Sequence, residues 1–250
     1  MKKLTSFICF VFVLILSISC EKEDYQKPLS DNYFEDAKVL QQFVQIDKQE
    51  MRYYLDLNAK HELLKLLPNN TTEQAARIGE VSKKRFIDQL NTLNAYIQQE
   101  IKKGATYVVM ATEQDSWFKQ LDSSASSFFI QPNSPPLSPL QKALSFIYFN
   151  KPGEVPTDTE FYASDHINTQ VTVSSQDGTG NIAATLKCRT GTSPQGEVTD
   201  SSTLVITTPG TTYAMSYYWI NTRTGNNVQW IFKGTVNRDN VWATAEVSND

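Results

Sequence analysis

The chain has few of the side chains from which enzyme and metal sites are most often built. Its 250 residues include two histidines and three cysteines. His61 stands in HELLK, which matches a zinc-protease helix up to the position of the second histidine, where Lys65 is found. Because that ligand is missing, we expect His61 to be a structural residue rather than a metal ligand or a base.

The second histidine, His166, follows Ser164 and Asp165, an order that suggests a catalytic triad. Neighbouring side chains in an extended segment point to opposite faces, so adjacency in the sequence works against hydrogen bonds among the three. The sequence also contains no G-x-S-x-G nucleophile motif. We therefore expect His166 to lie in a polar loop before a strand. A hydrolase whose acids meet His166 only in the folded chain stays open as an alternative.

Glycine-rich stretches are equally scarce. Gly178 and Gly180 in DGTGN, and Gly225 in TGNN, lie between predicted strands and precede no predicted helix. Phosphate binding needs a helix N-terminus or an equivalent nest of amides, so these residues are predicted to form turns. No segment has the spacing of a calcium-binding loop. The sequence therefore predicts no catalytic residue, no metal site and no cofactor.

Positive charge is in short supply relative to negative charge. The chain has 23 Lys and Arg against 27 Asp and Glu, a net charge of −4. Removal of residues 1–19 would take away two lysines and no acids, which gives 21 minus 27, or −6. Nucleic-acid binding depends on clustered Lys and Arg, so this balance argues against a nucleic-acid partner.

The main apolar run is short and lies at the start of the chain. Met1, Lys2 and Lys3 precede an apolar segment that extends from Phe7 to Leu16. At about ten residues, this segment is shorter than the roughly 20 that a membrane-spanning helix needs. The order of charged, apolar and small residues is typical of a secretory signal. We expect residues 1–19 to be a signal peptide that is removed.

The stretch LSISC, which ends at Cys20, resembles the lipobox of bacterial lipoproteins. In that family the signal is cut before a cysteine that carries the lipid, so the resemblance implies lipid attachment at Cys20. The next four residues, EKED, resemble the surface-export signal of Bacteroidota-type lipoproteins; a solvated tether is the alternative. The resemblance implies an outer-membrane lipoprotein, with residues 20–32 as its lipid-anchored tether and the cell surface as its destination if the export signal operates.

Cys188 would be the one cysteine of the mature chain that keeps a thiol. Cys9 would leave with the signal and Cys20 would carry the lipid, so no disulfide is possible within the chain. The alternation around Cys188 is typical of a strand with one buried face. We expect a buried, unreactive thiol.

Helical spacing dominates the first part of the mature chain. The predicted first helix covers residues 33–67, and the Pro68-Asn69-Asn70 stretch ends it. The predicted second helix begins at a capping box at Thr71 and ends at Lys102-Lys103-Gly104, where glycine suits a left-handed cap. Two helices of similar length joined by a short turn predict an antiparallel helical hairpin.

The segment from residue 105 to residue 150 gives a weaker signal. Residues 107–111 fit a short strand or a buried continuation, residues 115–121 fit a helix, and residues 140–149 fit one more short helix after Pro139. The proline-rich stretch QPNSPPLSP predicts a stiff connector.

After residue 150 the apolar period changes to two. The predicted strands cover residues 169–174, 181–188, 203–208, 213–220, 227–236 and 241–247. Strands at this spacing without intervening helices indicate an antiparallel sheet or sandwich. The predicted fold class is α+β: a mainly helical domain, residues 33–150, whose antiparallel hairpin is followed by an antiparallel β domain, residues 151–250.

The last two predicted strands suggest a binding face. If Arg238 and Asp239 form a two-residue turn, Trp242 lies opposite Thr235 and away from the apolar stripe of both strands. Lys233 and Glu246 would share that face, and Tyr218 would join it from the preceding strand. Packing of this face against the helical half is the alternative. The candidate ligand-binding residues are Trp242, Tyr218, Lys233 and Glu246.

These expectations combine into a lipid-anchored envelope protein without catalytic activity that acts as a binding or interaction module. Its expected partners are the membrane, through the lipid, and a protein or glycan ligand. A glycan-binding accessory protein that uses the aromatic sheet face is one alternative, and the hydrolase described above is the other.

Overall fold

The fold is described here from a computed structural model that places residues 31–58, 71–121, 128–133, 143–153, 159–192, 197–222 and 228–248. Residues 35–250 form one compact unit, distinct from residues 1–34. The predicted signal peptide, Cys20, His61 and Gly225 lie outside the described residues.

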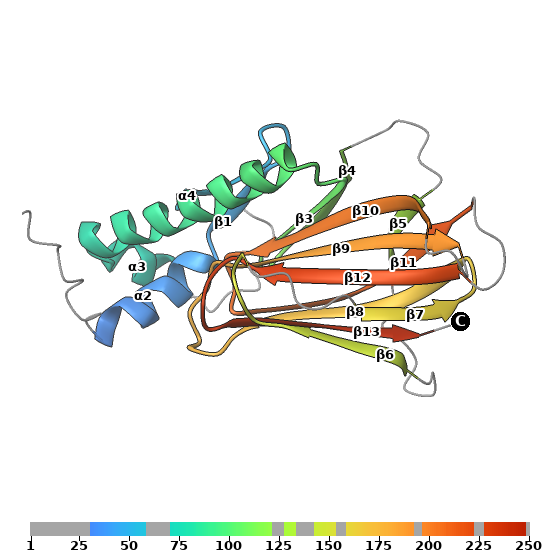
Figure 1. Cartoon of the computed structure of the whole chain (residues 1–250). Helices are drawn as coiled ribbons and strands as arrows, with labels where there is room; N and C mark the ends of the chain where they lie inside the picture. Colours follow the sequence, from blue (N-terminus) through green and yellow to red (C-terminus); the bar gives the residue numbers. More distant parts are fainter. Residues whose placement is uncertain are drawn as a thin grey trace, which may run out of the picture. The chain divides into compact units, whose positions relative to one another are not determined.

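Two large β-sheets dominate the unit (Figure 1). One sheet has six strands in the order β4-β3-β10-β9-β12-β7, and the other has five in the order β5-β11-β8-β13-β6. The pairings are antiparallel except for β10 with β3, which is parallel. In chain order the strands are β3 (Tyr107–Ala111), β4 (Ser116–Gln120), β5 (Phe128–Asn133), β6 (Ala143–Phe149), β7 (Thr159–Ala163), β8 (His166–Ser175), β9 (Ile182–Thr192), β10 (Glu197–Thr208), β11 (Thr212–Asn221), β12 (Val228–Val236) and β13 (Val241–Ser248).

The main core lies between the two sheets, so the fold is a β-sandwich. Both sheets contribute alternate residues of each long strand to one buried cluster, which is the period-two pattern of a strand with one inward face. Trp219 of the five-stranded sheet packs edge-on against Phe232 of the six-stranded sheet, with their ring centroids 5.3 Å apart. Such ring pairs across the core contribute to the packing of the two sheets.

A helical layer packs on the outer face of the six-stranded sheet. Helix α4 (Glu80–Lys102) follows the short helix α3 (Thr71–Arg77). The apolar stripe of α4 is buried against the outward residues of β3, β9 and β10, in a second cluster that includes Phe86, Leu90, Val108, Met110 and Val205. This outer face of the sheet is therefore partly covered by a helix.

The predicted helical hairpin is wrong. Helix α2 (Asp31–Gln41) ends early, and strands β1 (Val44–Asp47) and β2 (Arg52–Leu55) form a small antiparallel hairpin in the segment predicted to continue the helix. Asp47 stabilises the connecting turn, because its side chain accepts hydrogen bonds from the backbone amides of Gln49 and Glu50. Met51 follows with a positive φ of 50°. A side chain that bonds to nearby amides in this way offers the backbone an alternative to the helix.

The small hairpin is fixed to the rest of the unit by hydrogen bonds. The side chain of Asn94, on α4, accepts from the backbone amide of Tyr53 and donates to its carbonyl. The Tyr53 hydroxyl donates to the carbonyl of Thr207 on β10, at 2.8 Å. The segment from Val44 to Leu55, which has the apolar spacing of a helix, is thus a pair of strands that is hydrogen-bonded to both α4 and the six-stranded sheet.

The predicted second helix is confirmed except for one break. Helices α3 and α4 begin at Thr71 and end at Lys102 as expected, but Ile78 and Gly79 interrupt them. Gly104 has a φ of +95°, the left-handed conformation expected after the helix end.

The strand predictions after residue 150 are confirmed in position and period. Two helix predictions before that point are wrong, because residues 116–120 form β4 and residues 143–149 form β6. Strands β3 and β4 belong to the six-stranded sheet, and β5 and β6 are the two edge strands of the five-stranded sheet. The architecture is therefore mostly β, and the predicted α+β class with an N-terminal helical hairpin is corrected accordingly.

Arg238 links two turns that carry the chain between the sheets. Its guanidinium donates to Asp177 at 3.1 Å and to the carbonyl of Thr179 at 3.0 Å. Residues 176–181 connect β8 to β9, and residues 237–240 connect β12 to β13; each connection joins strands of different sheets. The Arg238 contacts hold these two crossovers side by side.

Candidate functional site

The predicted pairing of the last two strands is wrong. Strand β12 lies in the six-stranded sheet beside β9 and β7, whereas β13 lies in the five-stranded sheet beside β8 and β6. Trp242 is paired with Ser174 of β8 and not with Thr235. The residues of both strands that face the core were nevertheless predicted correctly. Alternation along a strand determines which residues are buried, and it is the same whether the two strands pair in a hairpin or lie in facing sheets.

The candidate residues consequently divide between two surfaces. Trp242, Glu246 and Tyr218 lie on the outer face of the five-stranded sheet. Lys233 lies on the outer face of the other sheet, opposite Lys187 of β9, with the core between it and Trp242. The structure therefore does not bring Lys233 into a common site with Trp242.

Tyr218 is also distant from Trp242 although they share a face. Tyr218 is level with Asn168 on β8, and Trp242 is level with Ser174. Six residues along a strand correspond to about 20 Å, and the two residues are two strands apart. Tyr218 instead packs against His166, with the ring centroids 5.4 Å apart.

Two aromatic residues that the sequence analysis missed lie beside Trp242 and Glu246. Phe146 and Tyr148 point outward from the edge strand β6, with exposed fractions of 56% and 48%. Phe146 is paired with Glu246, and Tyr148 is paired with Thr244. Trp242 is two residues beyond Thr244 on β13 and is partly buried. We call Phe146, Tyr148 and Trp242 the aromatic strip.

Polar side chains adjoin the aromatic strip on the next strands. Thr172 of β8 is paired with Thr244, and Gln170 is paired with Glu246. Both β8 residues are partly buried, whereas Glu246 is exposed. The strip is thus lined on one side by hydroxyl, amide and carboxylate groups at the spacing of adjacent strands, about 4.8 Å.

Charge is nearly absent from this outer face. Among the outward residues that the structure describes on the five strands, Glu246 is the one carboxylate, and there is no lysine or arginine. His166 also points outward, but it lies at the end of β8 that is farthest from Trp242. The other polar side chains there are hydroxyls and amides. The face is therefore aromatic and polar rather than ionic.

The opposite end of this face holds an acid and histidine pair. The Nδ1 atom of His166 is 2.8 Å from the nearer carboxylate oxygen of Asp165, so the expectation that these neighbours would not bond is wrong. The hydroxyl of Ser164 donates to the backbone carbonyl of His166 and not to its ring. The three residues therefore lack the relay from serine to histidine that a triad requires.

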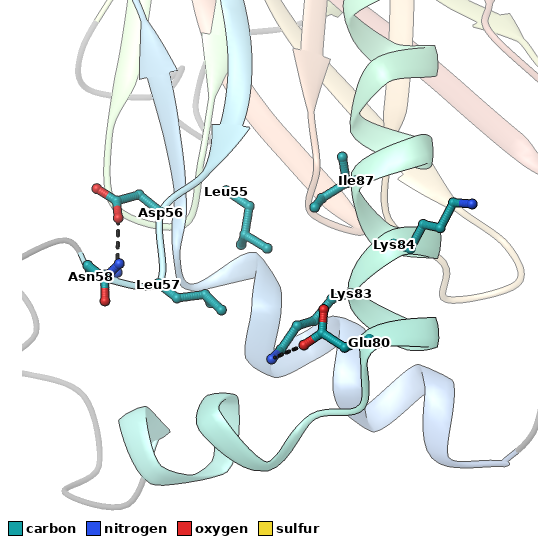
Figure 2. Close-up of a pocket in the computed structure, with 8 residues that line it drawn as sticks. All are labelled: Leu55, Asp56, Leu57, Asn58, Glu80, Lys83, Lys84 and Ile87. Carbon is teal, nitrogen blue, oxygen red and sulfur yellow. Dashed lines mark hydrogen bonds and ion pairs between the residues drawn. The ribbon is translucent and has the colours of Figure 1, made fainter.

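A pocket of about 400 Å³ lies between the end of β2 and the start of α4. Figure 2 shows Asp56 pointing away from Glu80, and Lys84 directed out of the pocket. Glu80 is paired with Lys83 at 2.9 Å. Two carboxylates that face each other across a cleft, as in glycoside hydrolysis, are not formed by Asp56 and Glu80.

Leu55, Leu57 and Ile87 supply the apolar part of that pocket. Its volume is in the range of ligand sites, yet its convergent polar groups are bonded to one another or directed away. The pocket is therefore a weaker candidate than the aromatic strip.

Cys188 is buried, as predicted. Its side chain is fully enclosed in the sandwich core, and burial raises the pKa of its thiol well above the usual value. Within the described ranges, no group of three or more His, Cys, Asp or Glu side chains is placed to hold a metal ion. Cys188 belongs to the core and not to a site.

Comparisons with protein-family models and with curated protein sequences find no match to this chain. Among the helices of the part that the structure describes, none is both long and apolar enough to cross a bilayer.

Proposed function

We propose that this chain is a non-catalytic binding module of a cell-envelope lipoprotein, anchored by lipid at Cys20 and binding its partner through the aromatic strip. The observation that carries the proposal is the exposure of two adjacent rings, Phe146 and Tyr148, on a sheet face that presents them beside Trp242. Large exposed aromatic side chains in a group mark interaction surfaces more often than isolated ones do.

The strip is held outward by the core beneath it. Ile147 and Phe149 alternate with the exposed rings along β6 and are buried between the sheets. A shift of one residue would bring Phe146 and Tyr148 inward, but it would also expose Ile147 and Phe149. The rings are thus fixed at the surface before any partner binds, which lowers the entropy cost of binding.

The side chains of the strip are of the types that contribute most to interfaces. Aromatic residues bury 150–250 Å² each when fully covered, and tryptophan and tyrosine are enriched among binding hot spots. The helical layer packs on the other sheet, and the apolar cluster beneath it contains, among the residues that the structure describes, none from β6 or β13. These features support a binding role for the five-stranded sheet.

The anchoring part of the proposal rests on the lipobox-like sequence. Residues 20–32 would connect the lipid to the folded unit. A module tethered in this way acts at the membrane surface, where the lipid fixes its location and the exposed rings of the aromatic strip remain available to a partner. The expected localisation is the outer membrane, and the cell surface if the EKED stretch acts as an export signal.

The described acids, histidine and serine do not form the site of a hydrolase. Asp165 and His166 bond to each other, but Ser164 donates to the backbone, and the acids that line the pocket do not oppose one another. Catalysis by any of these groups would need a nucleophile or a second carboxylate within hydrogen-bond reach of the reacting atoms. The described side chains do not supply that arrangement.

The proposal is tested by binding assays with purified residues 21–250. Wild type and the triple variant Phe146→Ala, Tyr148→Ala, Trp242→Ala are applied in parallel to a glycan array and a peptide array. The control is Tyr162→Ala, which removes a ring that is 50% exposed on edge strand β7 of the other sheet.

Binding by wild type and the control, with loss in the triple variant, supports the proposal. No binding by wild type on either array, or equal binding by the triple variant, contradicts it. Circular dichroism and thermal melts establish that the triple variant remains folded in the comparison.

A further inference from the structure

We infer that the ligand of the aromatic strip is an uncharged saccharide chain, an inference that rests on the proposed binding role. The strip combines two exposed rings and the partly buried Trp242 with neighbouring hydroxyl, amide and carboxylate groups, and the described outward residues of its sheet carry almost no other charge. Sugars present the complementary surface: an apolar ring face that packs on aromatic rings, with hydroxyl groups around its edge that hydrogen-bond to polar side chains.

Charge favours a neutral ligand over an ionic one. Glu246 lies opposite Phe146 and is exposed, and no described outward lysine or arginine of the five strands balances it. An anionic chain would bring like charges together beside the rings, which costs binding energy. A carboxylate accepts hydrogen bonds from hydroxyl groups, so the same Glu246 suits an uncharged polyol.

The length of the strip favours a chain over a single sugar. Phe146 is level with Glu246, and Trp242 is four residues from Glu246 along β13. Four residues of strand correspond to about 13 Å. Tyr148 lies between these two levels, so the three rings form a path along the sheet rather than a cage around one residue of sugar.

The edge position of β6 leaves one side of this path open. Strand β6 pairs with β13 and is the last strand of the five-stranded sheet. A long chain could therefore enter and leave the strip without its ends being enclosed. Binding within a long polysaccharide, and not only at its terminus, follows from this openness.

The test uses purified residues 21–250 and a panel of soluble polysaccharides. The uncharged members are hydroxyethyl cellulose, a β-glucan, a mannan, a xylan and a galactan; the charged counterpart with the same backbone is carboxymethyl cellulose. Affinity is measured by isothermal titration calorimetry and by retardation in native gels that contain the polysaccharide. A peptide array is run with the same protein preparations.

The inference predicts binding to at least one uncharged polysaccharide, at least tenfold weaker binding after Tyr148→Ala, and unchanged binding after Tyr162→Ala. Weaker binding to carboxymethyl cellulose than to hydroxyethyl cellulose is also expected if the cellulose backbone is the one recognised. Glu246→Gln keeps the shape of the side chain and removes its charge, so it should raise relative binding to the anionic member of that pair, or to the anionic derivative of whichever polysaccharide binds.

Two results would overturn the inference and are distinguishable from failure of the binding role. Peptide binding that is lost in the Tyr148→Ala variant, without binding to any uncharged polysaccharide, rejects the saccharide ligand but leaves the strip as a binding surface. Preferred binding of anionic chains by wild type rejects the charge argument. The absence of any ligand on both the panel and the array rejects the saccharide and the binding role together.

Discussion

The substitution Gly234→Ala tests whether β12 faces β6 across a sandwich core. A β-carbon added at Gly234 would lie 2.6 Å from three atoms of the Phe149 ring. Gly234 belongs to β12 in the six-stranded sheet, whereas Phe149 belongs to β6 in the five-stranded sheet. The methyl group is therefore predicted to push the two sheets apart or to rotate a buried ring.

The magnitude follows from the cost of overpacking. Phe149 is 1% exposed, so its ring has little room to move away. An inserted methyl group in a packed core costs about 1–3 kcal/mol. For a domain of this size, a loss of 1 kcal/mol lowers the melting temperature by about 2–4 °C, so we expect a fall of about 2–12 °C.

Urea unfolding followed by tryptophan fluorescence gives the free energy, and calorimetry gives the melting temperature. The control is Gly79→Ala, because a β-carbon there meets nothing within 4 Å; its effect should stay below about 1 kcal/mol. In the double variant with Phe149→Leu, part of the loss should be recovered. A Gly234→Ala protein as stable as wild type would refute the predicted contact between the sheets.

Three further predictions concern the anchor, the core thiol and the turn linkage. Cys20→Ala should abolish incorporation of radiolabelled palmitate, and continued labelling would rule out lipid attachment at Cys20. Cys188 should react with a thiol reagent slowly in the native protein and rapidly in denaturant, because it is fully buried; rapid native labelling would reject that placement. Partial burial acts to raise the pKa of Asp177, but hydrogen bonds from Ser175, Thr179 and Arg238 hold it well below its usual value. The resulting stability is present above about pH 4 and is lost as the pH falls toward the lowered pKa. Asp177→Asn should therefore be less stable than wild type at pH 7, with a smaller difference at pH 2; an unchanged difference between the two pH values would contradict the role of the charge.

The sequence carries most of the strand information in the second half of the chain. Alternation in the six predicted strands identifies the residues that face the sandwich core. It does not identify the partner of a strand. Trp230 and Val247 would face the same core in either of two arrangements: β12 and β13 paired in one sheet, or β12 and β13 placed in two sheets that face each other. The crossover through Arg238 and Asn240, which has a φ of 62°, decides between these arrangements.

The first helical prediction failed because apolar spacing in a short window fits more than one structure. Val44 and Tyr54 belong to the predicted helical stripe, but they lie on strands β1 and β2. The turn that separates β1 from β2 depends on the Asp47 side chain and contains no glycine or proline. Local turn chemistry of this kind has a weaker sequence signal than a glycine or a proline.

The aromatic strip was only partly predictable. Trp242 and Glu246 follow from alternation along β13, but the β6 sequence ALSFIYF is apolar or aromatic at all but one position and shows no period. Which residues of β6 point outward is determined by its pairing with β13, in which Phe146 and Tyr148 lie beside the outward residues Glu246 and Thr244. The enrichment of aromatic residues in strands was the one local signal that β6 is not a helix.

The most direct test of the strip compares two adjacent residues of β6. Ile147 is 3% exposed and faces the core, whereas Tyr148 is 48% exposed and faces outward. Ile147→Ala should lower the free energy of unfolding by about 2–5 kcal/mol, and Tyr148→Ala should lower it by less than about 1 kcal/mol. In the same preparations, ligand affinity on the polysaccharide panel or the peptide array should fall at least tenfold for Tyr148→Ala. A loss of stability in Tyr148→Ala as large as that in Ile147→Ala would show that the strip is buried core, and would contradict its role as a binding surface.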